Sequence, residues 1–391
     1  MTTERNTVTQ SPLTRWLPVI LAFVLGAGLA ALISATTANK AAQDGASAQT
    51  TTQAAAFDVA TAFPSWNKDS ASLASLVAFV QDVCDPKSAN YLEPEKRIAT
   101  FDMDGTLICE KGPYYLDYML LTYRVLDDPN YEADAETKQL CEQLRYYANR
   151  GTKNKDLTAG RRRAIASEFA GMTPEEFRAY VNQFLDTQKA GGFDGMTYGT
   201  SFYKPMLEVI DFLRANDFEV WIVSACEREV TRAVVERLGD DPSHVIATDV
   251  AYTSTKLGDQ KPYEYNMGQD EDVVLSTPLL EKCEQTNKSL AIAREIGKRP
   301  VLAFGNSSGD YGMLNYAKAN GGMGLLVVAD DEEREYGNAE KAKEIYQLVS
   351  EEAWTSFSMK DDWATIYGEG VVKTQLPGDV EDAETELAQA A

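Results

Sequence analysis

Apolar residues recur along the chain in short runs, each preceded by a longer stretch in which they follow helical spacing. The runs at 97–101, 219–223 and 300–304 place apolar residues on mostly consecutive positions, which is typical of strands buried on both faces. The stretches 72–85, 206–217 and 289–297, which precede them, have helical periodicity. Strands that alternate with helices indicate an α/β fold with a parallel sheet.

A helical, tyrosine-rich segment separates the first predicted strand from the second. Its stretches 136–150, 161–170 and 173–186 have helical periodicity, and Thr173-Pro174 is a typical helix start. We therefore predict a helical subdomain at 112–200, inserted after the first strand into a core made of residues 61–111 and 201–372. No internal repeat is evident.

An uninterrupted apolar run from Trp16 to Ala35 follows Arg5 and Arg15. Twenty helical residues span roughly 30 Å, the thickness of a bilayer core. Residues 1–35 are therefore predicted to be a signal peptide or a transmembrane anchor, with a buried core helix as the alternative. The preceding positive charge predicts that the rest of the chain is extracytoplasmic, either membrane-anchored or secreted.

Two further segments have the composition of solvated chain. Residues 36–60 are rich in Ala, Thr, Gln and Ser, which predicts a flexible linker. Residues 373–391 are acidic and contain few bulky apolar side chains, which predicts a solvated tail.

Composition and charge narrow the function. The 391 residues are 44% hydrophobic, ample for a buried core, and 60 acidic against 37 basic residues leave a net charge of −23. Such a field opposes nucleic-acid binding, so no nucleic-acid partner is expected. It also opposes an anionic substrate, so any phosphate site needs its own local positive charge. The five cysteines contain no metal-binding CxxC pair.

Candidate chemistry begins directly after the first predicted strand. Asp102 and Asp104 precede Gly105-Thr106, at the carboxyl edge where open α/β sheets bind ligands. An ionised Asp102 is a suitable covalent nucleophile, and Asp104 can act as acid and base if its pKa is raised. Thr106 can orient a phosphate oxygen. A solvated turn is the alternative for this segment.

Three later segments supply what phosphoryl transfer needs. Ser224, at the end of the second strand, can donate to a phosphoryl oxygen, and Lys288 can supply the fixed positive charge. Asn306 and Asp310, after the third strand, offer oxygen ligands that suit Mg²⁺. A strand-terminal serine, a surface lysine and a polar turn are the alternatives when each is taken alone.

Four segments follow one another in the chain: Asp102-x-Asp-Gly-Thr, Ser224, Lys288 and Asn306-Ser-x-x-Asp310. Their order resembles that of the motifs of the haloacid dehalogenase-like superfamily of phosphatases, and the resemblance covers residues 62–372. A narrower resemblance, to exported bacterial phosphoserine phosphatase-like hydrolases, rests on three segments: Gly-Thr-Leu-x-Cys-Glu at 105–110, Arg232, and Met-Lys-x-Asp-Trp at 359–363. The resemblance implies a Rossmann-like core with a helical cap.

The resemblance also implies roles for single residues. Asp102 is then the nucleophile, Asp104 the acid and base, and Ser224 and Lys288 are phosphate ligands. Mg²⁺ is held by the Asp102 side chain, the backbone carbonyl of Asp104 and the fourth motif. Asn306 departs from the aspartate that is common in that motif, which predicts weaker metal binding.

Residues around the predicted cap are more ambiguous. The resemblance places Glu110 against a substrate amine, although a hinge or surface carboxylate is an alternative. The run Arg161-Arg162-Arg163 has the chemistry to contact an anionic substrate, but solvated arginines are more common on helices. Tyr114, Tyr115 and Tyr118 fit the cap interface and core packing equally well.

Together these features predict a Mg²⁺-dependent phosphomonoester hydrolase that acts through an aspartyl-phosphate on a small phosphorylated metabolite. A phosphotransferase or mutase of the same fold is one alternative. A non-catalytic, surface-anchored binding module is another, and Asn306 is its only support. Asp104 argues against a dehalogenase. The sequence does not predict the oligomeric state.

Overall fold

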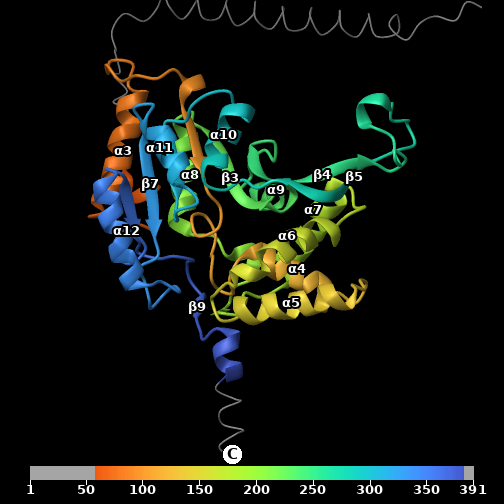
Figure 1. Ribbon diagram of the computed structural model, residues 1–391. Helices are drawn as coiled ribbons and strands as arrows, with labels where there is room; N and C mark the ends of the chain where they lie inside the picture. The colour runs from red at the N-terminus through yellow and green to blue at the C-terminus, as the bar shows by residue number, and fades with distance from the viewer. Residues whose placement is uncertain (1–57, 383–391) are drawn as a thin grey trace, which may run out of the picture. The chain divides into compact units, whose positions relative to one another are not determined.

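A seven-stranded sheet forms the centre of the molecule in the computed structural model, which describes residues 58–382 (Figure 1). The strand order is β5-β4-β3-β1-β6-β7-β8. The strands are β1 (Ile98–Phe101), β3 (Glu219–Glu227), β4 (Val245–Ser254), β5 (Val273–Glu281), β6 (Leu302–Gly305), β7 (Met323–Val328) and β8 (Thr355–Ser358). All neighbours are parallel except β4 and β5.

The mostly parallel α/β sheet confirms the predicted fold class, with one correction at its edge. β5 is antiparallel because it returns directly from β4 as the second arm of a long hairpin. Figure 1 shows the connecting segment projecting away from the sheet. Ser276, Thr277 and Pro278 interrupt the apolar pattern of β5, so the sequence predicts no strand there.

Helices cover both faces of the sheet, which is the doubly wound arrangement. On one face lie α3 (Ala71–Cys84), α8 (Lys204–Ala215) and α9 (Arg228–Arg237), whose apolar side chains join the larger core cluster. On the other lie α10 (Thr286–Glu295), α11 (Tyr311–Lys318) and α12 (Ala339–Glu351), with a second cluster. β1 and β6, fully buried between them, stack Phe101 on Phe304 with ring centres 4.1 Å apart.

Four of the helices between β1 and β3 gather together in Figure 1: α4 (Leu116–Leu126), α5 (Ala135–Ala148), α6 (Thr158–Ser167) and α7 (Pro174–Thr187). We call them the cap helices. Thr173 and Glu176 close a reciprocal capping box at the start of α7, as the Thr-Pro signal indicated. α6 contacts β5 and α7 contacts α9, so the cap helices meet the core at one end of the sheet.

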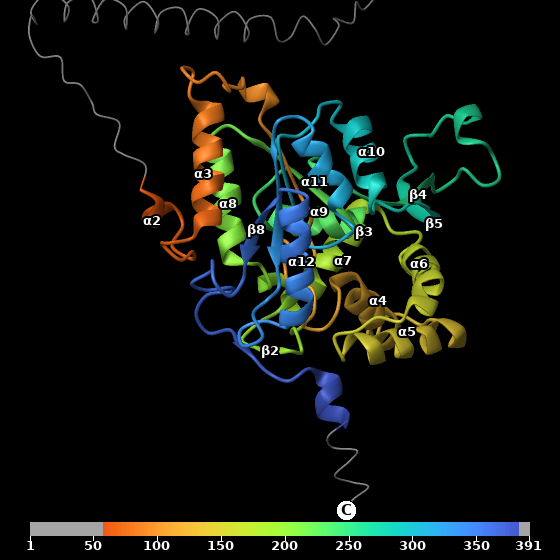
Figure 2. The same cartoon turned by 60° about the vertical axis from the view of Figure 1, so that its left-hand side comes forward.

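The short elements tie the chain's C-terminal part to the cap helices. β9 (Val372–Lys373) pairs antiparallel with β2 (Phe193–Asp194), and residues 377–382 are helical below β2 in Figure 2. Leu376 is only 6% exposed, and Arg150 forms an ion pair with Asp382. Residues 373–378 therefore pack against the protein, which corrects the predicted solvated tail over this part, whereas residues 379–382 are exposed. One buried leucine was too weak a signal in an acidic sequence.

The predicted leader at 1–35 and most of the predicted linker lie outside the described residues. Within residues 58–382, no helix is long and apolar enough to cross a membrane.

Candidate active site

Asp102 lies at the carboxyl edge of the sheet, immediately after β1. Its backbone amide donates to the carbonyl oxygen of Phe304 at 2.9 Å, which continues the pairing of β1 with β6 by one residue. The side chain is buried at the base of a cavity. The buried strand therefore holds the predicted nucleophile in place.

Lys288 and Thr106 contact the two oxygens of this carboxylate. Lys288, in the first turn of α10, donates from Nζ to Asp102 Oδ1 at 2.6 Å and to Asp310 Oδ1 at 2.7 Å. The Thr106 hydroxyl donates to Asp102 Oδ2 at 3.2 Å. The structure thus brings four predicted site residues into one buried hydrogen-bonded group.

The loop after β6 is organised around Asp310. The Oδ2 atom of Asp310 accepts from the backbone amides of Asn306 and Ser307, at 3.0 and 3.1 Å. Asn306 itself lies against Gly105, whose φ is +78° and where a Cβ atom would lie 1.9 Å from Asn306 Nδ2. Glycine is needed at position 105 for both reasons.

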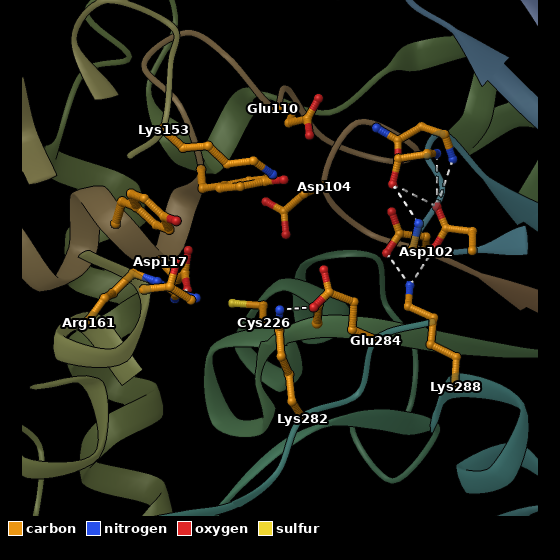
Figure 3. A pocket seen from close by; sticks show the side chains of 18 of the residues that line it. Asp102, Asp104, Glu110, Asp117, Lys153, Arg161, Cys226, Lys282, Glu284 and Lys288 are labelled. Atoms are coloured by element: carbon orange, nitrogen blue, oxygen red, sulfur yellow. Dashed lines mark hydrogen bonds and ion pairs between the residues drawn. The ribbon is translucent and has the colours of Figure 1, made fainter. Parts of the chain in front are cut away.

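Asp104 projects into the middle of the same cavity (Figure 3). Its Oδ1 atom is buried and has no hydrogen-bond partner among the residues that the structure describes. Burial, and then the negative charges of Asp117 and Asp102, raise the pKa of the Asp104 carboxyl well above its usual value. A carboxyl group with a raised pKa holds its proton more tightly and can donate that proton to a leaving group.

The donors around Asp102 fit a magnesium ion. Burial, and then the charge of Asp310, raise the pKa of Asp102 to about 7 against the opposing effect of Lys288. Asp102 and Asp310 share the single positive charge of Lys288, so negative charge remains that can bind a second cation. Within 58–382 no three His, Cys, Asp or Glu side chains group as a metal site. The set thus needs the Asn306 amide and the Asp104 carbonyl oxygen, both hard donors.

Ser224 does not lie where the sequence predicted. β3 continues three residues past it, to Glu227, so Ser224 is not at the strand end. Its side chain is fully buried, and its Oγ atom accepts from the backbone amide of Cys226 at 3.1 Å. Ala225 and Cys226 line the cavity in its place. Ser224 interrupts the apolar run of β3, and this hid the true end of the strand.

Glu110 lines the cavity and is half-buried. Burial raises its pKa, while the positive charges of Lys111 and Lys341 oppose the rise. This position disagrees with the alternative of a surface carboxylate.

The cavity has a volume of about 220 Å³ and is bounded by the cap helices as well as the core. Several of its charged residues were not predicted: Asp117, Lys153, Lys155, Lys282 and Glu284. Of the arginine run, Arg161 reaches it, and so do Tyr115 and Tyr118. The run and the tyrosines were the only sequence signals for this half of the cavity, because the lysines are isolated in the chain.

The family model of the haloacid dehalogenase-like hydrolases matches residues 99–315, from β1 to α11. No curated protein in the comparison matches the chain.

Among solved structures, a protein of unknown function from Bordetella pertussis Tohama I is 15% identical, with a TM-score of 0.44, over 67% of this chain and 98% of its own. A phosphoserine phosphohydrolase-like protein from Francisella tularensis subsp. tularensis SCHU S4 is 17% identical, with a TM-score of 0.37, over 64% and 92%. Cytosolic 5'-nucleotidase IIIB bound to cytidine is 12% identical, with a TM-score of 0.40, over 75% and 88%.

Structural similarity at 12 to 17% sequence identity does not identify the substrate. The family model is different, because it covers more than half of the chain and spans the residues that meet at the cavity. The chain belongs to the haloacid dehalogenase-like hydrolases.

Proposed function

We propose that this hydrolase is a Mg²⁺-dependent phosphomonoesterase that acts through an aspartyl-phosphate on a small organic phosphate. The observation that carries the proposal is the pairing of two unlike carboxyl groups in one cavity. Asp102 is held by Lys288 at 2.6 Å, whereas the buried Oδ1 of Asp104 has no partner among the described residues. One carboxylate is thus positioned to attack and the other to carry a proton.

In the first step, an Asp102 carboxylate oxygen attacks the phosphorus atom, and the bond from phosphorus to the ester oxygen breaks. The departing alkoxide takes the proton of Asp104 and leaves as an alcohol. Lys288 contacts the nucleophile directly and offsets part of the negative charge that gathers there. The Thr106 hydroxyl fixes the other oxygen of the nucleophile.

In the second step, water attacks the phosphorus atom of the aspartyl-phosphate. Asp104, now ionised, takes a proton from this water, and inorganic phosphate leaves with regeneration of the Asp102 carboxylate. The Asp102 side chain, the Asp104 carbonyl oxygen, Asn306 and Asp310 would hold Mg²⁺. When bound, this ion supplies positive charge that stabilises the transferring phosphoryl group.

The cavity volume supports a small substrate. At about 220 Å³ it lies below the roughly 300 to 1,000 Å³ of typical small-molecule pockets. A small phosphorylated metabolite is therefore the proposed partner. The apolar run from Trp16 to Ala35 supports an extracytoplasmic location, membrane-anchored or secreted, which cell fractionation would test.

The decisive experiment replaces the nucleophile. Asp102→Asn should lower Mg²⁺-dependent release of p-nitrophenol from p-nitrophenyl phosphate by about 10³-fold or more, because an amide does not form the covalent intermediate. The exposed Asp259→Asn on the β4–β5 connection is the matched control and should retain activity. Retained activity in Asp102→Asn, with an unchanged circular dichroism spectrum, would refute the proposal.

Two further measurements separate the alternatives. Beryllium fluoride, which mimics an aspartyl-phosphate, should bind the unmodified protein only with Mg²⁺ present. A binding module without catalysis would show neither this binding nor turnover. Added acceptor alcohols should leave the phosphate yield unchanged, whereas a phosphotransferase would form new phosphate esters.

A further inference from the structure

Positive charges gather in the part of the cavity that faces away from the nucleophile. Lys153, Lys155, Arg161 and Lys282 all line it. Figure 3 shows Arg161 and Lys153 on the side opposite to Lys288, with Lys282 below them. The chain as a whole carries a net charge of −23, so its composition does not lead us to expect four cations in one cavity.

These cations come from both sides of the junction between cap and core. Lys153 precedes the first turn of α6, Arg161 lies on α6, and Lys282 directly follows β5. α6 and β5 are in contact, so the like charges are brought together by the tertiary structure. Burial, and then the charges of Arg162 and Arg161, lower the pKa of Lys282 to about 8. Asp117 and Glu284 offset part of the repulsion between these cations, and a bound anion would offset more of it.

The neighbouring carboxylates leave hydrogen-bond donors unused. Arg161 forms an ion pair with Asp117, and Lys282 forms one with Glu284. The Arg161 side chain is only 11% exposed, yet its Nε atom has no hydrogen-bond partner among the described residues. The same holds for Nε of Arg162, which lines a small recess beside Arg161 and Lys282. Buried donors without acceptors are uncommon in folded proteins and favour a ligand that accepts from them.

We propose that Arg161 and Lys282 form a subsite for a second anionic group of the substrate. The substrates are then phosphate monoesters that also carry a carboxylate or a second phosphate, with Lys282 as a residue that determines specificity. This proposal rests on the proposed function, because the ester phosphate must lie at Asp102. The anion then lies between Arg161 on α6 and Lys282 directly after β5, and offsets the repulsion between them.

The test compares probes of equal chain length. Propyl phosphate has no second charge, 3-(phosphonooxy)propanoate adds a carboxylate, propane-1,3-diyl bisphosphate adds a phosphate, and 3-aminopropyl phosphate adds a cation. A hydrogen bond to a charged group contributes about 1.5 to 3 kcal/mol, so kcat/KM should be about 10- to 100-fold higher for the preferred anionic probe than for propyl phosphate. The two anionic probes show which second group the subsite takes.

In Lys282→Met, the ratio of kcat/KM for the preferred anionic probe to kcat/KM for propyl phosphate should fall to within about threefold of unity. The reason is that the removed ammonium is one of the two proposed contacts. Lys282→Arg should restore most of it. Lys261→Met, an exposed lysine on the same hairpin, is the matched control and should leave the ratio unchanged. A ratio near unity in the unmodified protein, or an unchanged ratio in Lys282→Met, would overturn the proposal.

Calorimetry with two phosphonates tests the subsite without turnover. Binding of 3-phosphonopropanoate should be at least about tenfold tighter than that of propylphosphonate, and Lys282→Met should remove the difference. If none of the four ester probes were hydrolysed, and p-nitrophenyl phosphate were not hydrolysed either, the proposed function would fail. Equal binding of the two phosphonates would refute the subsite separately.

Discussion

Replacement of Lys288 by methionine is the most direct probe of the electrostatics at the active site. The side chain is only 1% exposed, and its Nζ atom lies 2.6 Å from Asp102 Oδ1 and 2.7 Å from Asp310 Oδ1. Methionine has a similar length but no charge. Lys288→Met therefore leaves two buried carboxylates close together with no cation between them, while the packing changes little.

The size of the effect follows from this burial. Removing one partner of a buried ion pair typically destabilises a protein by about 3 to 5 kcal/mol, because the remaining charge stays desolvated. Here one lysine serves two carboxylates, so we expect the upper half of that range. The double variant Lys288→Met/Asp310→Asn should recover about 1 to 3 kcal/mol, because one of the two unpaired charges is then gone.

Urea unfolding in EDTA measures these free energies without a contribution from bound metal. Lys298→Met is the control, since its Nζ atom donates to the carbonyl oxygen of Glu95 at the surface, and this variant should lower the free energy of unfolding by less than about 0.5 kcal/mol. The reasoning would be refuted if Lys288→Met lowered the free energy of unfolding by less than about 1 kcal/mol, or if the double variant recovered none of the lost free energy.

Three further variants test the metal site and a buried acid. Gly105→Ala should raise the Mg²⁺ concentration for half-maximal activity at least about tenfold, because the new methyl group displaces the Asn306 amide. Asn306→Asp should lower that concentration by about tenfold, since it adds one anionic ligand. Burial raises the pKa of Glu227 to about 8, above the ordinary carboxyl value near 4.3, so the folded state binds this proton more tightly and stability falls as pH rises between the two values. Glu227→Gln should therefore melt several degrees above the unmodified protein at pH 9, with a difference that shrinks toward pH 5; equal melting at pH 9 would contradict this.

Local sequence patterns predicted the position of those residues whose environment depends on their neighbours in the chain. The apolar runs before Asp102 and Asn306 became β1 and β6, because strands buried on both faces require such runs. The position of Asp102 at the sheet edge followed directly. Lys288 was predicted from its place in a motif order, although its contact with Asp102 joins residues 186 positions apart.

The sequence by itself thus determined the α/β class, the carboxylates after β1 and the polar loop after β6. Only the tertiary structure decided that Ser224 is buried inside β3, that residues 373–378 pack against the protein, and that Lys282 and Arg161 line the same recess. The physical reason is that periodicity reports whether a side chain is buried, not which distant residue lies beside it. Lys282 and Arg161 stand far apart in the chain, and the pairing of β5 with β4 and its contact with α6 bring them to one cavity.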